Sequence, residues 1–249
     1  MYGLKKDPRS WYGRIDIFLT RLGFTKSKVD TNLYIKVMDD ELVILLLYVD
    51  ELFLSGNEKH IVECKKKIFE EFEMKDLGLM HYFLGLEVWH STKGIFLNQG
   101  KYAVEILKRF DMLDCKVMAT PMNTNLKLLS YETSDLVDMT HYRQIIRSLI
   151  YLTNKRPDIC FVVNILSQCL VKHRPIHLVA ANHVMRYLKG TIDLGLYYGR
   201  DHDYNLYGYT YSDWAGSAAD RKSTLGGCYC LGSIMISWFG PMFLSVQLK

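Results

Sequence analysis

The feature that most limits how this chain can fold is a long apolar run that two adjacent carboxylates interrupt. Residues 42–49 read LVILLLYV, Asp50 and Glu51 follow, and residues 52–54 resume as LFL. Such apolar stretches, rich in branched side chains and broken by one polar pair, predict two strands joined by a tight turn. Carboxylates at the tip of such a hairpin form either a polar turn that faces solvent or a site for a divalent cation, which prefers oxygen ligands. These residues alone leave both interpretations open.

The rest of the chain alternates between helical and strand-like periods, which predicts the α+β class. Apolar side chains recur at helical spacing in residues 9–23, 58–74, 100–110, 140–153, 157–170 and 175–189. Strand-like stretches occupy residues 32–38, 41–48, 81–89, 94–98, 193–199, 204–211, 226–231 and 234–239. The polar stretch 116–138 carries Pro121 and is typical of a linker or surface loop. The change of period near residue 191 predicts a second, β-rich unit.

The composition is that of a folded globular protein with a mildly basic surface. Of the 249 residues, 49% are hydrophobic and 23% are charged, and the formal net charge is +4. This charge permits binding to a polyanion, and a generic basic surface is the alternative. The six cysteines show no zinc-type pairing, and the N-terminus has no apolar signal core. The longest apolar run is too short to span a bilayer, so we expect no membrane segment and an intracellular location, in the cytoplasm or nucleus.

A series of short motifs follows the chain in a single order. The tetrapeptide YVDE at residues 48–51 lies between two apolar runs, and residues 2–12 upstream read YGLKKDPRSWY. Further stretches are residues 74–78 (MKDLG), 81–88 (HYFLGLEV), 101–103 (KYA), 112–116 (MLDCK), 120–122 (TPM), 151–159 (YLTNKRPDI), 186–191 (RYLKGT), 212–216 (SDWAG) and 221–224 (RKST). Together they resemble copia-type retrotransposon reverse transcriptases, whose hairpin carries Y-V-D-D and whose upstream stretch is Y-G-L-K-Q-A-P-R-x-W-Y. The resemblance extends over nearly the whole chain up to Trp238.

The resemblance implies a truncated reverse-transcriptase palm and thumb with a helical connection, followed by an incomplete RNase H-like β-unit. Residues 1–115 are expected to form the partial palm and the start of the thumb. Residues 116–190 would form a linker and the helical thumb and connection. Residues 191–249 would form a truncated RNase H-like segment.

The resemblance also implies RNA-directed DNA polymerase activity, which is template-directed nucleotidyl transfer with Mg²⁺ (or Mn²⁺). Asp50 and Glu51 are the expected catalytic and metal-binding residues, because two ions bridged by carboxylates serve transfer to a 3′-hydroxyl. The other expected residues are Tyr48, Lys5, Pro8 and Trp11 near the nucleotide and template, Phe83, Leu84 and Gly85 in the primer grip, and Asp213 as an RNase H remnant. The expected partners are an RNA or DNA template–primer and a deoxynucleoside triphosphate, while the oligomeric state stays open.

Three departures from the family pattern lead us to expect that this chain alone is inactive. The family's metal site also uses an aspartate on an earlier palm strand, which would lie before Met1. Glu51 stands where the family has aspartate, so its carboxylate is displaced by about one carbon–carbon bond, and catalytic sites tolerate only small displacements. Tyr211 stands where the family has the first RNase H acid, and Asp213 remains there. The alternatives are a non-catalytic nucleic-acid-binding remnant and a translated pseudogene fragment.

Basic and aromatic residues offer weaker signals for contact with nucleic acid. Seven basic residues lie on segments that would face a duplex, or are ordinary solvated surface: Lys5, Lys6, Arg9, Arg14, Lys101, Lys108 and Arg109. Phosphate contacts of this kind add salt-dependent affinity. The tyrosines between residues 197 and 211 are more typical of β-strand residues than of a platform on which bases stack. Trp11 and Trp89 are typical of core anchors.

Overall fold

The structure, a computed structural model, divides into a first unit of residues 1–78 and a second unit of residues 79–249. Its described residues are 7–49, 51–123, 139–171, 174–200, 205–212 and 223–244. Helices and antiparallel sheets occur together, which confirms the α+β class. Within these ranges, none of the helices has the length and apolar character needed to cross a bilayer.

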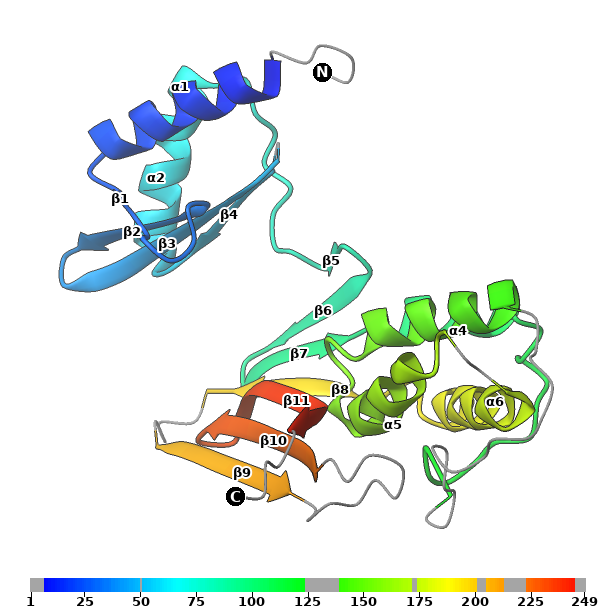
Figure 1. Ribbon diagram of the computed structural model, residues 1–249. Helices are drawn as coiled ribbons and strands as arrows, with labels where there is room; N and C mark the ends of the chain where they lie inside the picture. Colours follow the sequence, from blue (N-terminus) through cyan, green and yellow to red (C-terminus); the bar gives the residue numbers. More distant parts are fainter. Residues whose placement is uncertain are drawn as a thin grey trace. The chain divides into compact units, whose positions relative to one another are not determined.

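The first unit is a four-stranded antiparallel sheet with two helices. Its elements are α1 (Asp7–Arg21), β1 (Thr25–Lys26), β2 (Leu33–Met38), β3 (Glu41–Tyr48), β4 (Glu51–Ser55) and α2 (Glu58–Glu71). The strands lie in the order β1-β2-β3-β4, and Figure 1 shows α1 and α2 on the same side of this sheet. The sequence predicted each of these elements except the two-residue strand β1.

Side chains alternate along β3, and this alternation determines which face of the sheet is covered. Val43, Leu45 and Leu47 are buried in the core that α1 and α2 cover. The intervening Leu42 and Ile44 are 56% and 37% exposed, because successive side chains of a strand point to opposite faces. The two helices therefore leave an apolar face of the sheet open, and we call it the open face.

A hydrogen bond fastens α1 to the sheet. The Tyr34 hydroxyl on β2 donates to Asp16 Oδ1 on α1 at 2.5 Å, and Lys26 Nζ on β1 donates to the same oxygen at 2.9 Å. These two donors hold the pKa of the Asp16 carboxyl below its usual value, and the Tyr34 hydrogen bond contributes most. The contact holds α1 in place over β1 and β2, and β2 pairs with the hairpin strand β3.

The second unit combines four helices with two antiparallel sheets. Its elements are β5 (Tyr82–Phe83), β6 (Leu86–Ser91), β7 (Gly94–Asn98), α3 (Gly100–Arg109), α4 (Met139–Leu152), α5 (Pro157–Gln168), α6 (Pro175–Gly190), β8 (Gly195–Gly199), β9 (Leu206–Ser212), β10 (Ser223–Leu231) and β11 (Ile234–Leu244). One sheet has the order β5-β6-β7-β8 and the other β11-β10-β9. The helices share a core of fully buried side chains that includes Leu107, Leu149, Val163 and Val184. Of the predicted linker, residues 116–123 form no helix or strand, and residues 124–138 lie outside the described ranges.

Strand β8 has a different partner from the one that the sequence predicted. The change of period near residue 191 placed it in a second β-rich unit, but it pairs with β7. Two glycines permit this pairing: a Cβ at Gly94 would lie 2.3 Å from the Tyr198 carbonyl oxygen, and one at Gly195 would lie 2.2 Å from that of Leu97. Only β9, β10 and β11 form the separate sheet. The two units meet at residues 78 and 79, so the functional divisions after residues 115 and 190 stay predictions.

An ion pair between the buried Arg156 and the partly exposed Asp158 joins the start of α5 to the end of α6. The Arg156 side chain is 3% exposed, and it donates to the Asp158 carboxylate at 2.9 and 2.7 Å. It also donates to the carbonyl and the hydroxyl of Thr191, at 2.9 and 2.7 Å, and the Tyr187 hydroxyl donates to Asp158 at 2.9 Å. Burial alone would raise the pKa of Asp158, but the hydrogen bonds and charge of Arg156, with the Tyr187 hydrogen bond, lower it overall.

Asp158→Asn is expected to lower the stability of the second unit at pH 7 by about 3 kcal/mol, because Arg156 would be left buried without a counter-charge. The pKa of Asp158 is lower in the folded chain than in the unfolded chain. Its contribution is therefore complete above the unfolded value, near 3.9, and is lost as pH falls through the folded value. Urea unfolding at pH 7 and at steps below pH 4, with hydrogen exchange to follow α5 and α6, measures the effect.

The matched control for this prediction is Asp193→Asn, which changes an exposed acid just after α6. The control should stay within about 0.5 kcal/mol of the unaltered chain. The stability gap between Asp158→Asn and the unaltered chain should narrow as pH falls below about 4. Equal losses in both variants, or a gap that does not change with pH, would contradict the assignment.

Candidate active site

The carboxylate hairpin is the tip of the β3–β4 strand pair. Tyr48 on β3 pairs with Glu51 on β4, so two positions of the sequence, 49 and 50, separate the paired residues. Asp50 lies outside the described residues, and the positions of its neighbours define the tip. The pair before the tip is the buried Leu47 with Leu52, which is partly buried and packs against the same core. Because side chains alternate, Tyr48 and Glu51 belong to the opposite, open face.

The loop holds Val49 in an unfavourable backbone conformation. Its φ is +54°, in the left-handed region that a branched side chain rarely adopts. Two-residue hairpin loops require positive φ values, which glycine and asparagine tolerate best. Strain of this kind costs of order 1–3 kcal/mol and is typically retained at functional positions. The tip is therefore better explained by the placement of its side chains than by turn stability.

The tip supplies few acids among the described residues. Glu51 is exposed and has no ion-pair partner in this part of the chain. Strand β2, which lies next to β3, reads LYIKVM and carries no acid. In the described ranges no three histidine, cysteine or acidic side chains gather into a metal-binding group. With Asp50 outside these ranges, metal binding by Asp50 and Glu51 stays a prediction.

The predicted primer grip is a second tight hairpin turn. Phe83 pairs with Leu86, so Leu84 and Gly85 form the loop, with φ values of +47° and +77°. The hydroxyl of Tyr151, at the end of α4, donates to the Leu84 carbonyl oxygen. A Cβ at Gly85 would lie 3.2 Å from that hydroxyl, so glycine suits both the conformation and the space. The turn is thus positioned by a helix far away in the sequence.

The start of α3 is tied to the same hairpin. The Glu87 side chain on β6 is buried, and it accepts the backbone N–H of Lys101 at 2.9 Å. Lys101 Nζ lies 3.7 Å from the other Glu87 oxygen and 5.3 Å from the Tyr82 ring centroid. A carboxylate at a helix N-terminus is favourable. These contacts hold β5, β6 and α3 together around the predicted grip.

The remaining predicted residues divide into described and undescribed ones. Trp11 is half-buried and packs against the core of the first unit, and Tyr48 is 40% exposed at the tip. Pro8 lies in the first turn of α1. Lys5 and Asp213 lie outside the described residues.

The prediction that Trp89 anchors a core is wrong: Trp89 is 61% exposed, because strand alternation places it opposite the buried side chain before it.

Several of the basic residues predicted to face a duplex already have acidic partners. Arg14 donates to Glu71 at 2.8 Å, and Arg109 donates to Glu105 at 2.6 Å. Lys108 is exposed. Lys5 and Lys6 lie outside the described ranges, as does the side chain of Arg9. Exposed ion pairs contribute only about 0–1 kcal/mol, so a phosphate can replace the acidic partner at little cost.

Comparison with known proteins identifies the family. The family model described as Reverse transcriptase (RNA-dependent DNA polymerase) matches residues 1–124. The chain is 38% identical over 242 residues to the Retrovirus-related Pol polyprotein from transposon RE2 of Arabidopsis thaliana, which covers 96% of this chain and 16% of that protein. It is 33% identical over 260 residues to the Retrovirus-related Pol polyprotein from transposon TNT 1-94 of Nicotiana tabacum, 100% of this chain and 20% of that protein. The chain belongs to the reverse transcriptase family of copia-type retrotransposon Pol polyproteins.

The relatives differ greatly in length. An uncharacterized mitochondrial protein of Arabidopsis thaliana is 41% identical over 195 residues, 78% of this chain and 81% of that protein. By contrast, this reverse transcriptase chain spans only 16% to 20% of the Pol polyproteins named above. No solved structure matches the chain significantly. The family resemblance predicted from the motifs is confirmed, and the roles of single residues stay predictions.

Two features of this reverse transcriptase chain were missed by sequence reasoning. The positive φ of Val49 has no signal in the sequence, since valine is a rare choice for that conformation. The contact from Tyr151 to Leu84 joins residues that are 67 positions apart. Tyr151 was noticed only as part of a motif, and no local pattern connects it with the primer-grip turn.

Val49→Gly is expected to stabilise the first unit by about 1 kcal/mol, because glycine adopts positive φ without steric cost. Urea unfolding of the full chain, with hydrogen exchange to follow β3 and β4, measures the change. Val29→Gly is the matched control: Val29 is 99% exposed in a loop and does not have a positive φ. That variant should be neutral or slightly destabilised. A Val49→Gly variant that is no more stable than the control would contradict the assigned strain.

Tyr151→Phe is expected to destabilise the second unit by about 1 kcal/mol, the usual net value of one hydrogen bond. The loss should be local, with faster hydrogen exchange at Leu84 and Gly85 and little change in α5. Tyr197→Phe is the control, since Tyr197 is half exposed on β8. If exchange in the turn is the same in Tyr151→Phe and in the control, the hydroxyl does not position the turn.

Proposed function

We propose that this chain carries the catalytic hairpin of template-directed nucleotidyl transfer, with Asp50 and Glu51 as the acids that hold Mg²⁺ (or Mn²⁺). The observation that carries the proposal is the two-residue loop, in which Val49 keeps a positive φ. A turn selected for stability alone would favour glycine or asparagine there. Strain retained beside two carboxylates indicates that their placement matters more than the stability of the loop.

The donor chemistry of the tip suits a hard divalent cation. Mg²⁺ takes carboxylate oxygens and keeps several waters, so that one or two carboxylates per ion suffice. Glu51, on the open face, offers such oxygens, and Asp50 is its neighbour in the sequence. When bound, the ion would offset the negative charge that develops on the phosphoryl group under attack. The residues of the tip thus fit the metal that the family resemblance implies.

We assign the open face of the first unit to the primer terminus and the incoming deoxynucleoside triphosphate. Tyr48 and Glu51 share this face with the exposed apolar side chains of Leu42 and Ile44. By family resemblance, Lys5, Pro8 and Trp11 lie near the template and nucleotide. The primer itself is assigned to the Phe83, Leu84 and Gly85 turn, whose backbone Tyr151 holds in place.

The finer architecture follows the same resemblance. We assign residues 1–115 to a palm and the start of a thumb, and residues 116–190 to a linker and a helical connection. Strands β9, β10 and β11, three consecutive antiparallel strands, support an RNase H-like segment after residue 191. Tyr211 on the edge strand β9 takes the place of one acid, which leaves Asp213 as the remnant of that site.

A second function, nucleic-acid binding without catalysis, is favoured by one observation. Two bridged ions require a further acid on a strand beside the hairpin, and the neighbouring strand β2 carries none. Glu51 also extends its carboxylate further than an aspartate would. We therefore propose that the 249-residue chain by itself binds a primed template without extending the primer.

Primer extension by the purified chain tests this proposal. We expect no extension of a primed RNA or DNA template with Mg²⁺ or Mn²⁺, because losing a metal ligand costs orders of magnitude in phosphoryl transfer. Glu51→Asp should not restore activity by itself. If extension does occur and Asp50→Asn abolishes it, the non-catalytic proposal is wrong, and another carboxylate of this chain completes the site.

Binding to the same primed template should be indifferent to sequence and steeply dependent on salt. Three phosphate contacts would lower the affinity roughly 40-fold between 50 and 200 mM salt, because each contact releases counterions. Fluorescence anisotropy at both concentrations measures this. Lys101→Gln combined with Lys108→Gln should flatten the salt dependence, whereas Lys67→Gln, on α2 and paired with Glu63, is the control. Affinity that does not change with salt, or no binding at 50 mM, would refute the binding function.

A further inference from the structure

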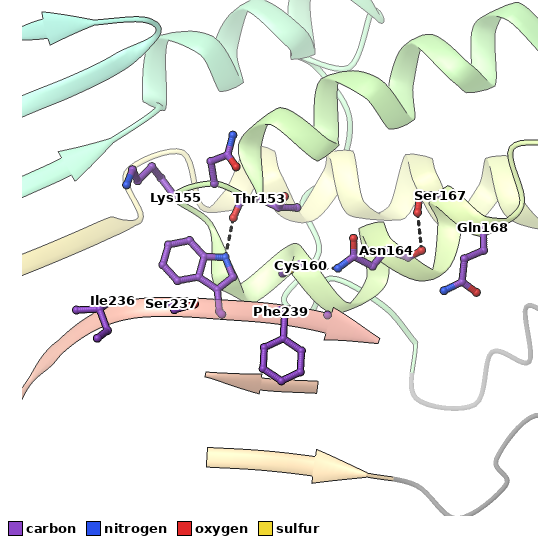
Figure 2. A pocket seen from close by; sticks show the side chains of 12 residues that line it. Thr153, Lys155, Cys160, Asn164, Ser167, Gln168, Ile236, Ser237 and Phe239 are labelled. Carbon is purple, nitrogen blue, oxygen red and sulfur yellow. Dashed lines mark hydrogen bonds between the residues drawn. The ribbon is translucent and has the colours of Figure 1, made fainter. Parts of the chain in front are cut away.

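A pocket of about 550 Å³ in the second unit lies between α5 and β11. Its lining residues are Thr153, Asn154, Lys155, Cys160, Asn164, Ser167, Gln168, Ile236, Ser237, Trp238, Phe239 and Gly240. Figure 2 shows Lys155 at one end of the pocket and Gln168 at the other, with Asn164 between them on α5. The pocket is thus elongated along the helix. Neither the predicted hairpin nor the predicted primer grip contributes to it.

The charge of the lining is unbalanced. Among the described residues that line the pocket, Lys155 is the one charged side chain, and none is an aspartate, glutamate, arginine or histidine. Lys155 is half-buried, and in the described part of the chain no acid forms an ion pair with it. Its nearest acid in the sequence, Asp158, is already bound to Arg156 at 2.7 Å. Burial lowers the pKa of Lys155, as expected for a cation that loses water without gaining a counter-ion.

The walls of the pocket are held by specific contacts. The indole Nε1 of Trp238 on β11 donates to the Thr153 carbonyl oxygen at 2.7 Å. The Ser167 hydroxyl donates to the Asn164 carbonyl oxygen at 2.7 Å. A Cβ at Gly240 would lie 3.0 Å from the Cys160 carbonyl oxygen, so glycine suits the close approach of β11 to α5. The pocket is therefore formed by packed elements of one unit.

We propose that this pocket binds a phosphate group, with Lys155 as its counter-charge and the neutral amides and hydroxyls of the lining as hydrogen-bond donors. Lysine presents a compact ammonium that pairs with phosphate as a point charge. The side chains of Asn154, which is next to Lys155 in the sequence, and Ser237 can donate to the several acceptor oxygens of such an anion. The phosphate belongs either to a free mononucleotide or to a nucleic-acid strand. The inference depends on the pocket alone and not on the hairpin, so it can be tested separately from template binding.

The charge of the Lys155 side chain also predicts how phosphate binding depends on pH. Phosphate binds the protonated Lys155 side chain. Because burial lowers the pKa of that group, affinity should fall as pH rises through this lowered value, before an ordinary lysine near 10.4 loses its proton. Loss of binding only above the range of an ordinary lysine would contradict a role for Lys155. This profile is measured on the unaltered chain and does not depend on any variant.

Calorimetric titration of the full chain with inorganic phosphate, dAMP, adenosine and a short oligothymidylate tests the proposal. Phosphate and dAMP should bind, whereas adenosine, which lacks the anion, should not. Lys155→Gln should weaken dAMP binding at least fivefold. Lys93→Gln removes a charge from an exposed turn of the same unit and should stay within twofold. Lys155→Arg, which keeps the charge, should retain binding within about threefold.

The outcomes separate the sources of the phosphate. Tighter binding of the oligothymidylate than of dAMP, lost in Lys155→Gln, would identify a strand of nucleic acid, and the reverse order would identify a mononucleotide. Equal weakening in Lys155→Gln and Lys93→Gln would reduce the effect to general surface charge and overturn the proposal. Binding of adenosine as tight as that of dAMP would also overturn it. Anisotropy of the primer–template with the Lys155→Gln variant measures whether template binding is retained. This measurement distinguishes phosphate binding in the pocket from the binding function of the whole chain.

Discussion

The register between β3 and β4 is the constraint on which the candidate active site depends. Val43, Leu45 and Leu47 must lie beneath α1 and α2, and each buried aliphatic side chain contributes roughly 1.5–3 kcal/mol. A slip of one residue would expose all three at once. The register that avoids this pairs Tyr48 with Glu51. Hydrophobic burial therefore forces a loop of two residues, and the strain at its first position follows from that length.

Several basic side chains of the described chain are paired with acids at short distances. Arg14, Arg109 and Lys101 lie against acids, and Arg156 is engaged by Asp158 and its neighbours. Contact with a polyanion would proceed by exchange of partners at exposed pairs, which costs little. Lys155 is half-buried and forms no ion pair with an acid of the described chain, and such a cation gains more from an anion because it is already partly desolvated.

Most of the fold follows from periodicity. The helices α1 to α6 and the strands β2, β3 and β6 to β11 were all predicted, because their apolar residues repeat with the period of the element that they form. The partners of the strands were harder to predict. Strand β8 joins β7 because Gly94 and Gly195 leave space for a neighbouring backbone, and no local pattern expresses that. Trp89 was placed in a core for its size, although alternation puts it on the exposed face.

The sequence by itself determined the class of the fold, the hairpin with its two carboxylates and the family, because these depend on local pattern and on the order of motifs. The tertiary structure decided how the parts are held. The positive φ of Val49 follows from strand register, the support of Leu84 comes from Tyr151 on a distant helix, and Lys155 is half-buried without an ion pair to any acid of the described chain. Each of these depends on which groups meet in space. Sequence spacing cannot express that, since contacts between remote segments arise only when the core is packed.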